Sequence, residues 1–240
     1  MKKFISIIVF LYLLFLSGSV FADKTVTIAT TDWEPYVGQN LENYGFSAEI
    51  VTAAYSKAGY KTVFKFYPWA RAVKMSEEGK ADGLFPAYWN KEREEKYVFT
   101  ESYTSGLVGF FKLKGAKITY TTLKDLAPYR IGIVRGYANT PEFDAADYLK
   151  KDESSTDFEN IKKMLKERID LFVCDKFVGF HLIHSKLPHM KGQIEFISPA
   201  LKDQKIFICI SRAIPDSSDK VNAFNKGLAI IKADGTALPI

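Results

Sequence analysis

The sequence predicts an α/β protein of two lobes, each a mostly parallel sheet with helices on both faces. Two observations support this: strand-like and helix-like segments alternate along the chain, and one pattern occurs twice. In both copies, at 80–85 and 168–174, a basic residue and an aspartate lead from a helical stretch into a short apolar strand. Alternation of strand, helix and strand favours parallel pairing, because the helix returns the chain to the same end of the sheet.

The first lobe begins with β-branched residues in alternation, which predict a strand. Pro35 ends that strand because it cannot donate to a ladder. Ser47 is expected to cap the following helix, and Gly59 to end it. The expected elements of this lobe are strands at 25–30, 61–66 and 84–85, and helices at 48–57 and from Trp69 onward.

The second lobe repeats this alternation after an apolar strand that leaves the first unit. The expected elements of the second lobe are strands at 107–113, 130–134, 171–174 and 194–197, and helices at 140–149, 158–167 and 177–184. A strand at 205–211 and a helix at 219–233 are expected after it. The charged residues 150–153 are expected to form a solvated turn. Two chain crossings, near 103–106 and 203–205, predict a discontinuous first lobe (23–103 plus 206–240) and an inserted second lobe (104–205).

The first 22 residues have the features of a cleavable signal peptide. Lys2 and Lys3 are followed by an apolar run at 4–16, and small residues precede Asp23. A retained membrane anchor is the alternative, but the run is shorter than the roughly 20 residues of a membrane span. The sequence therefore predicts an exported, periplasmic protein.

Composition excludes several classes of function. The chain has 33 Lys+Arg and 28 Asp+Glu residues, evenly mixed, which argues against nucleic-acid binding. His181 and His184 lie three apart without a third ligand, so we expect no metal, and no cofactor motif occurs. Cys174 and Cys209 lie in apolar runs; we expect two buried free thiols, although a disulfide stays open. We expect a monomer.

Opposite charges follow the two copies of the repeated pattern. Arg93 follows the first strand and Asp175 ends the second, so a small zwitterion could be held between them if the lobes face each other. For Arg93 the alternative is a solvated charge run. Four aromatic residues are further candidates for the walls of a ligand site, although they could instead seal the edge of the core: Trp33, Tyr36, Trp69 and Tyr88. The turn with Arg135 and Tyr137 is a candidate anion site, because the start of a helix attracts anions.

Several motifs occur in the order typical of one known family. They are DWEPY at 32–36, GFS at 45–47, WAR at 69–71, GKADG at 79–83, ER at 92–93, FTESY at 99–103 and the segment 168–175. With them the mature chain resembles the family 3 bacterial extracellular solute-binding proteins, the receptors of polar amino-acid ABC importers. The segment 85–90 is bulkier than that family's usual pattern.

The resemblance implies a type II periplasmic-binding-protein fold, with two lobes joined by two hinge strands that close on a ligand. It implies that Arg93 holds an α-carboxylate, that Asp175 holds an α-ammonium, and that Trp33 and Trp69 contact the ligand's side chain. We therefore expect a non-enzymatic binding protein for an amino-acid-like solute, with an inner-membrane ABC permease as partner. The alternatives are a cyclohexadienyl-dehydratase-like enzyme on the same fold and an orphan or sensory binding domain.

Overall fold

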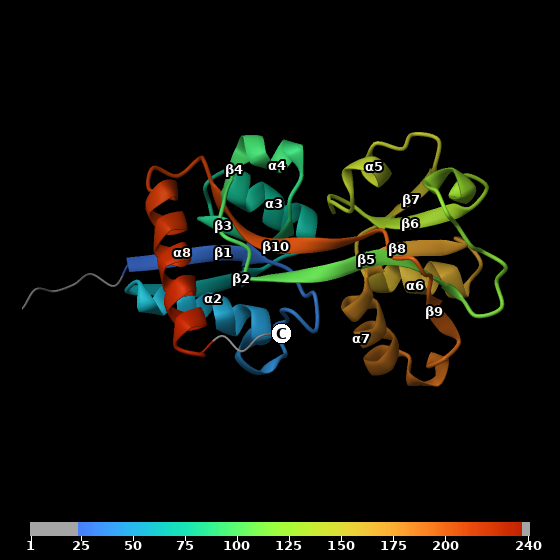
Figure 1. Ribbon diagram of the computed structural model, residues 1–240, viewed down its shortest axis with the longest axis horizontal. Helices are drawn as coiled ribbons and strands as arrows, with labels where there is room; N and C mark the ends of the chain where they lie inside the picture. The colour runs from blue at the N-terminus through green and yellow to red at the C-terminus, as the bar shows by residue number, and fades with distance from the viewer. Residues whose placement is uncertain (1–23, 237–240) are drawn as a thin grey trace, which may run out of the picture.

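The computed structural model describes residues 24–236, in which two lobes lie side by side (Figure 1). One sheet runs through both lobes in the order β2-β1-β3-β10-β5-β8-β6-β7, with β4 added to β10 and β9 to β5. The predicted two-lobed α/β architecture is confirmed. The predicted signal peptide lies outside the described residues.

The first lobe is built on parallel pairs. β1 pairs in parallel with both β2 and β3, as the helices that follow β1 and β2 require. Figure 1 shows α3 and α4 on one side of this sheet and α2 on the other. The elements are β1 (Lys24–Thr30), α2 (Phe46–Lys57), β2 (Tyr60–Phe66), α3 (Trp69–Glu77), β3 (Gly83–Tyr88), α4 (Lys91–Lys96), β4 (Tyr97–Phe99) and α8 (Ser217–Ala233).

The second lobe repeats the parallel arrangement, with β6 paired to both β7 and β8. β8 is buried at all five positions, which is why it appears in the sequence as an unbroken apolar run. The elements are β6 (Arg130–Val134), α5 (Pro141–Asp144), β7 (Lys150–Ser154), α6 (Asp157–Leu165), β8 (Leu171–Asp175), α7 (Lys176–Lys186) and β9 (Ile194–Phe196).

Two long antiparallel strands connect the lobes: β5 (Thr104–Leu113) and β10 (Lys202–Ser211). They pair with each other from Thr104 opposite Ile206 to Val108 opposite Lys202. Beyond this stretch β10 pairs with β3 in the first lobe, and β5 pairs with β8 in the second. The chain thus crosses between the lobes close to the two predicted segments, 103–106 and 203–205. The exact lobe boundaries, at 103/104 and 205/206, stay a prediction.

Three local predictions were wrong. Residues 150–153 form strand β7 and not a turn, because they pair in register with β6. The helix expected over 140–149 ends at Asp144, and Ala145 already serves as its C-cap. Ser47 lies inside α2, whose N-cap is Gly45, and the helix has no side-chain cap.

One large hydrophobic cluster runs through both lobes. Tyr55, Phe85 and Phe224 are fully buried in the first lobe, and Phe111 and Phe172 in the second. The two cysteines are buried and free, as predicted. Within residues 24–236, no helix is both long and apolar enough to cross a membrane.

Candidate functional site

A cleft lies where the carboxyl ends of the parallel strands of the two lobes face each other, the usual ligand position in open α/β sheets. β3 contributes Tyr88 from one side and β8 contributes Asp175 from the other. The cavity between the lobes encloses about 30 Å³. It is lined by Thr31, Trp33, Trp69, Pro86, Ala87, Tyr88, Arg93, Tyr137, Ala138 and Ile206.

Asp175 links the two lobes through its side chain. Its Oδ1 accepts hydrogen bonds from the backbone N–H groups of Phe177 (2.9 Å) and Val178 (3.2 Å), which caps α7. Its Oδ2 accepts from the hydroxyls of Tyr88 (2.9 Å) and Tyr36 (3.3 Å), both in the first lobe. Asp175 is only 3% exposed, and burial raises its pKa to about 6, because water no longer stabilises the charged form.

Gly106 on the crossing strand β5 leaves room for this cluster. A Cβ atom at this position would lie 2.2 Å from Asp175 Oδ2, 2.6 Å from the Tyr88 hydroxyl and 3.1 Å from the Tyr36 hydroxyl. A side chain here would therefore push the carboxylate and the phenols apart. Gly106 is not among the residues predicted for the site; its one signal in the sequence is a glycine inside an apolar strand, which often marks a close approach.

Arg93 also reaches the opposite lobe. Asn90 caps α4 by accepting from the Arg93 backbone N–H, which fixes the position of Arg93 shortly after the carboxyl end of β3. Its Nη1 donates to the Tyr88 carbonyl (2.7 Å) and its Nη2 to the Gly136 carbonyl of the second lobe (2.9 Å). The guanidinium lies 5.3 Å from the ring centre of Trp69, and burial lowers the pKa of Arg93.

The Gly136 carbonyl is shared between two side chains of the first lobe. Besides Arg93, the Trp69 indole Nε1 donates to it over 2.8 Å. Gly136 has φ 76°, in the left-handed region that favours glycine, and the turn it forms presents this carbonyl to the cleft. The turn therefore presents a carbonyl acceptor to donors of the first lobe. From the sequence we expected the turn to present N–H donors to an anion.

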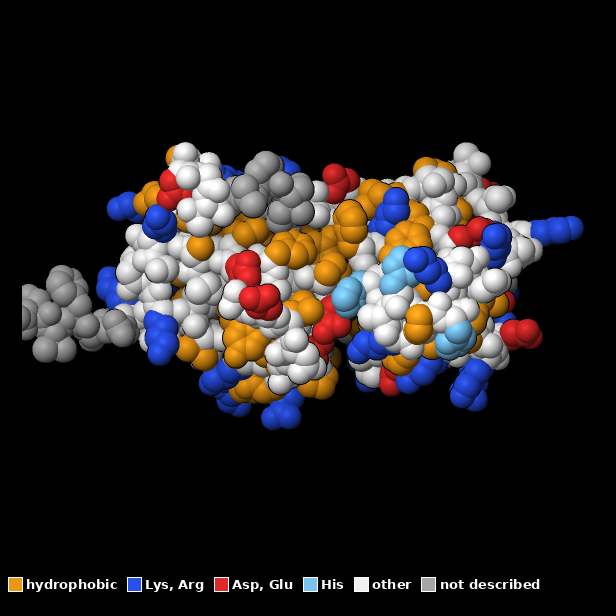
Figure 2. Space-filling model, turned by 90° about the horizontal axis from the view of Figure 1, so that it is seen from below, with side chains coloured by type: hydrophobic (Ala, Val, Ile, Leu, Met, Phe, Trp, Pro, Cys, Tyr) orange, Lys and Arg blue, Asp and Glu red, His pale blue; other side chains and the backbone are white. Residues whose placement is uncertain are grey.

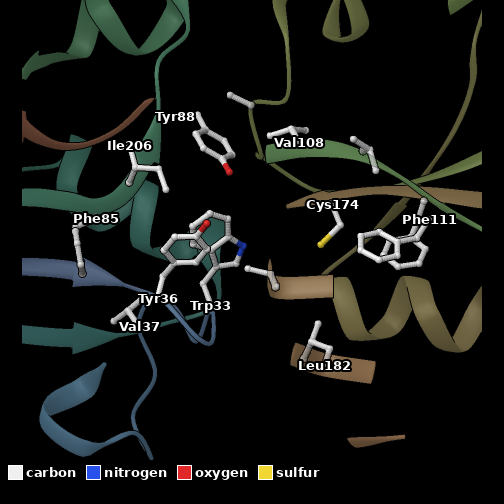
Figure 3. Packing of buried hydrophobic residues seen from close by; sticks show 14 of the residues in the cluster. Trp33, Tyr36, Val37, Phe85, Tyr88, Val108, Phe111, Cys174, Leu182 and Ile206 are labelled. Carbon is white, nitrogen blue, oxygen red and sulfur yellow. The ribbon is translucent and has the colours of Figure 1, made fainter. Parts of the chain in front are cut away.

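Aromatic rings gather between the lobes, and Figure 3 shows Trp33, Tyr36 and Tyr88 close together there. Trp33 stacks on Tyr36 with ring centroids 4.6 Å apart, and Tyr88 meets Trp33 edge-on at 5.7 Å. Trp69 meets Tyr137 of the second lobe at 5.7 Å and 86°. Trp33 Nε1 is buried without an acceptor among the described residues.

Arg135 differs from the other candidates, because the structure places it outside the cavity lining. Its Nε donates to Glu153 on β7 over 2.9 Å, and its side chain is 69% exposed. The missed strand explains this position: Arg135 donates its backbone N–H to Ser154 and so continues beside β7. Besides Asp175 itself, the other six candidate residues line the cavity or contact Asp175 directly.

A second pair of side chains spans the lobes at the rim of the cleft. His181 Nε2 on α7 lies 3.1 Å from Glu34 Oε2 in the loop after β1. On the face seen in Figure 2, histidine and acidic side chains meet where the lobes adjoin. No local sequence pattern indicates this pair, because the two residues are 147 positions apart. Within residues 24–236, no group of three His, Cys, Asp or Glu side chains could hold a metal ion.

The chain is similar to known proteins in sequence and in fold. The model of the family "Bacterial extracellular solute-binding proteins, family 3" matches residues 26–240. An uncharacterized protein from Shewanella oneidensis is 25% identical over 150 residues, 60% of this chain and 56% of that protein. This chain thus matches little more than half the length of that curated relative.

Solved structures share the fold at low sequence identity. A histidine kinase sensor domain with similarity to periplasmic binding proteins has a TM-score of 0.77, 18% identity and coverage of 89% of this chain and 92% of that one. An ancestral arginine-binding protein bound to arginine has a TM-score of 0.74, 22% identity, and 89% and 94% coverage. For the GluR0 ligand-binding core from Nostoc punctiforme with L-glutamate, the values are 0.73, 18%, 88% and 95%.

Proposed function

Because the chain belongs to the family 3 bacterial extracellular solute-binding proteins, we propose that it captures a small amino-acid-like solute between its two lobes. Capture would consist of binding and closure by bending of the two crossing strands, without bond chemistry. The contacts from Asp175 to Tyr36 and Tyr88, and from Arg93 to Gly136, already join the lobes. A ligand that binds there would therefore change the angle between the lobes.

The observation that best supports this proposal is the buried carboxylate of Asp175. All four of its hydrogen bonds come from neutral groups, and no cation of residues 24–236 forms an ion pair with it. Buried charges in proteins are usually paired, and an ammonium group supplies both a charge and N–H donors. Asp175 would thus accept the ligand's ammonium group.

Arg93 would complete the binding of a zwitterion. Two of its five N–H groups donate to carbonyl oxygens, which leaves three for a ligand carboxylate. Trp33, Tyr36, Trp69, Tyr88 and Tyr137 would form the walls. We further propose that the protein works in the periplasm as a monomer and delivers its ligand to an inner-membrane ABC permease.

A thermal-shift screen of the mature chain against amino acids and related amines tests the proposal. A ligand present at 100 times its dissociation constant stabilises the protein by about 2.7 kcal/mol, a shift that is easily measured. The Arg93→Ala and Asp175→Ala variants should lose that shift. The proposal is wrong if no amino acid or amine stabilises the protein, or if both variants bind as the native protein does.

One observation favours a second candidate function, that of a dehydratase on the same fold. The Glu34–His181 pair places a carboxylate and an imidazole at the cleft rim, as proton transfer would require. Incubation with a cyclohexadienyl amino-acid precursor distinguishes the two functions. Binding alone leaves the ultraviolet spectrum unchanged, whereas a dehydratase produces a new aromatic chromophore, which Glu34→Gln should abolish.

A further inference from the structure

The cavity between the lobes is walled by rings from both of them. Trp33, Trp69 and Tyr88 come from the first lobe, and Tyr137 comes from the second. Trp33 and Tyr88 meet at 82°, and Trp69 and Tyr137 meet at 86°. Perpendicular pairs of this kind present both ring faces and ring edges, the two surfaces on which a further aromatic ring packs favourably.

Most of the remaining lining is apolar, and among the described residues its free polar groups are donors, the Trp33 indole N–H and N–H groups of Arg93. Pro86, Ala87, Ala138 and Ile206 supply only apolar side chains to the cavity. The Tyr88 hydroxyl donates to Asp175, and the Trp69 indole N–H donates to Gly136. Among the lining side chains, Thr31 is the only small hydroxyl.

This lining discriminates between classes of amino-acid-like ligand. An amide that enters this cavity loses its hydrogen bonds to water and finds few acceptors for its N–H groups. An aromatic hydrocarbon ring has no such hydrogen bonds to lose, and it contacts four rings in the cavity. Discrimination against a buried, unpaired polar group amounts to roughly 10- to 100-fold in affinity.

We propose that the solute captured by this cleft carries a planar aromatic ring, which lies among Trp33, Trp69, Tyr88 and Tyr137 while its ammonium group binds Asp175. This inference rests on the proposed function and specifies its ligand class. Arg93 and Trp69 both bond to Gly136 across the cavity, so entry of a ring requires the lobes to part and these two bonds to lengthen. The hinge strands permit this motion.

Calorimetric titration of the mature chain tests the inference with four matched ligands: L-phenylalanine and L-tryptophan against L-glutamine and L-leucine. We expect one of the aromatic ligands to bind at least 10-fold more tightly than glutamine and leucine. Tighter binding of glutamine or leucine overturns the inference and leaves the proposed function standing. Absence of binding by any amino acid or amine overturns both.

A pair of tyrosine variants in the same lobe supplies the control. Tyr137→Ala removes one wall and should weaken aromatic binding at least 10-fold, whereas Tyr148→Ala removes an exposed ring outside the cleft and should change nothing. If Tyr137→Ala does not fold, Ala138→Asn provides a second variant, because it adds an amide to the lining and should reverse the preference toward glutamine. Unchanged ligand preference in the folded variants contradicts the inference.

Discussion

Replacing Asp175 by asparagine should separate the two roles that the structure gives this carboxylate. Oδ1 caps α7 through the N–H groups of Phe177 and Val178, and Oδ2 faces Tyr36 and Tyr88 in the cleft. Asparagine caps helices about as well as aspartate and has nearly the same shape. The Asp175→Asn variant should therefore keep its fold and its helix cap while losing the charge and the oxygen that accepts from Tyr36 and Tyr88.

The expected magnitudes differ for the two roles. Loss of one partner of a buried, hydrogen-bonded charge pair weakens binding by roughly 2–5 kcal/mol, which is a roughly 30- to 4,000-fold loss of affinity for an ammonium ligand. Asp175→Ala should show the same loss and, in addition, lower the free energy of unfolding by about 1 kcal/mol, because the cap is removed.

Calorimetry measures the affinity, and urea unfolding of the ligand-free protein measures the stability. The comparison of Asp175→Asn with Asp175→Ala isolates the cap from the charge. Binding of an amino-acid-like ligand to Asp175→Asn within threefold of the native protein would refute the role of Asp175 as ammonium acceptor. Equal stability of the two variants would refute its role as helix cap.

Three further outcomes follow from the same geometry. Gly106→Ala should weaken ligand binding at least 10-fold in calorimetry, since its Cβ would displace Asp175 and Tyr88, whereas the neighbouring Ser105→Ala should not. Affinity for an ammonium ligand, titrated from pH 8 to 5, should fall below about pH 6 as Asp175 is protonated; a flat profile would contradict this. The folding stability of the ligand-free protein should depend on pH in the opposite direction, because burial raises the Asp175 pKa. Asp175 contributes to the free energy of unfolding at low pH, and this contribution is lost as pH rises through about 6. Cys174 and Cys209 should react with a thiol reagent at pH 8 only after unfolding, because both are buried and burial raises the Cys209 pKa to about 12; fast reaction in the native protein would show that they are accessible.

Periodicity predicted most of the fold, and its failures have local physical causes. Strand β7 is the outermost strand of its lobe and is mostly exposed, so it has the composition of a solvated turn. Only pairing with β6 makes it a strand, and pairing is not visible in a local pattern. The helix predicted over 140–149 is a single turn, because Thr140 caps its start and Asp144 at its end accepts from the Asn139 backbone N–H. The apolar residues that follow pack into the core without helical geometry.

The site shows the same division between local and long-range information. Arg93 and Asp175 could be found because each follows a strand end, and strand ends of the two lobes meet at the cleft. The bonds that they make to Gly136 and Tyr88 depend on how the lobes close, which no short motif encodes. The rim pair of Glu34 and His181, residues 147 apart in the sequence, was missed for the same reason.

The pairing of Thr104 with Ile206 has a consequence for the way this protein can be taken apart. The chain leaves the first lobe and returns to it on adjacent strands, so the two ends of the intervening segment lie side by side. A tight turn in place of that segment would reconnect β5 to β10 without stretching either strand. We therefore expect that the segment between the two crossings can be exchanged for that of a relative, which would join half of one recognition surface to half of another.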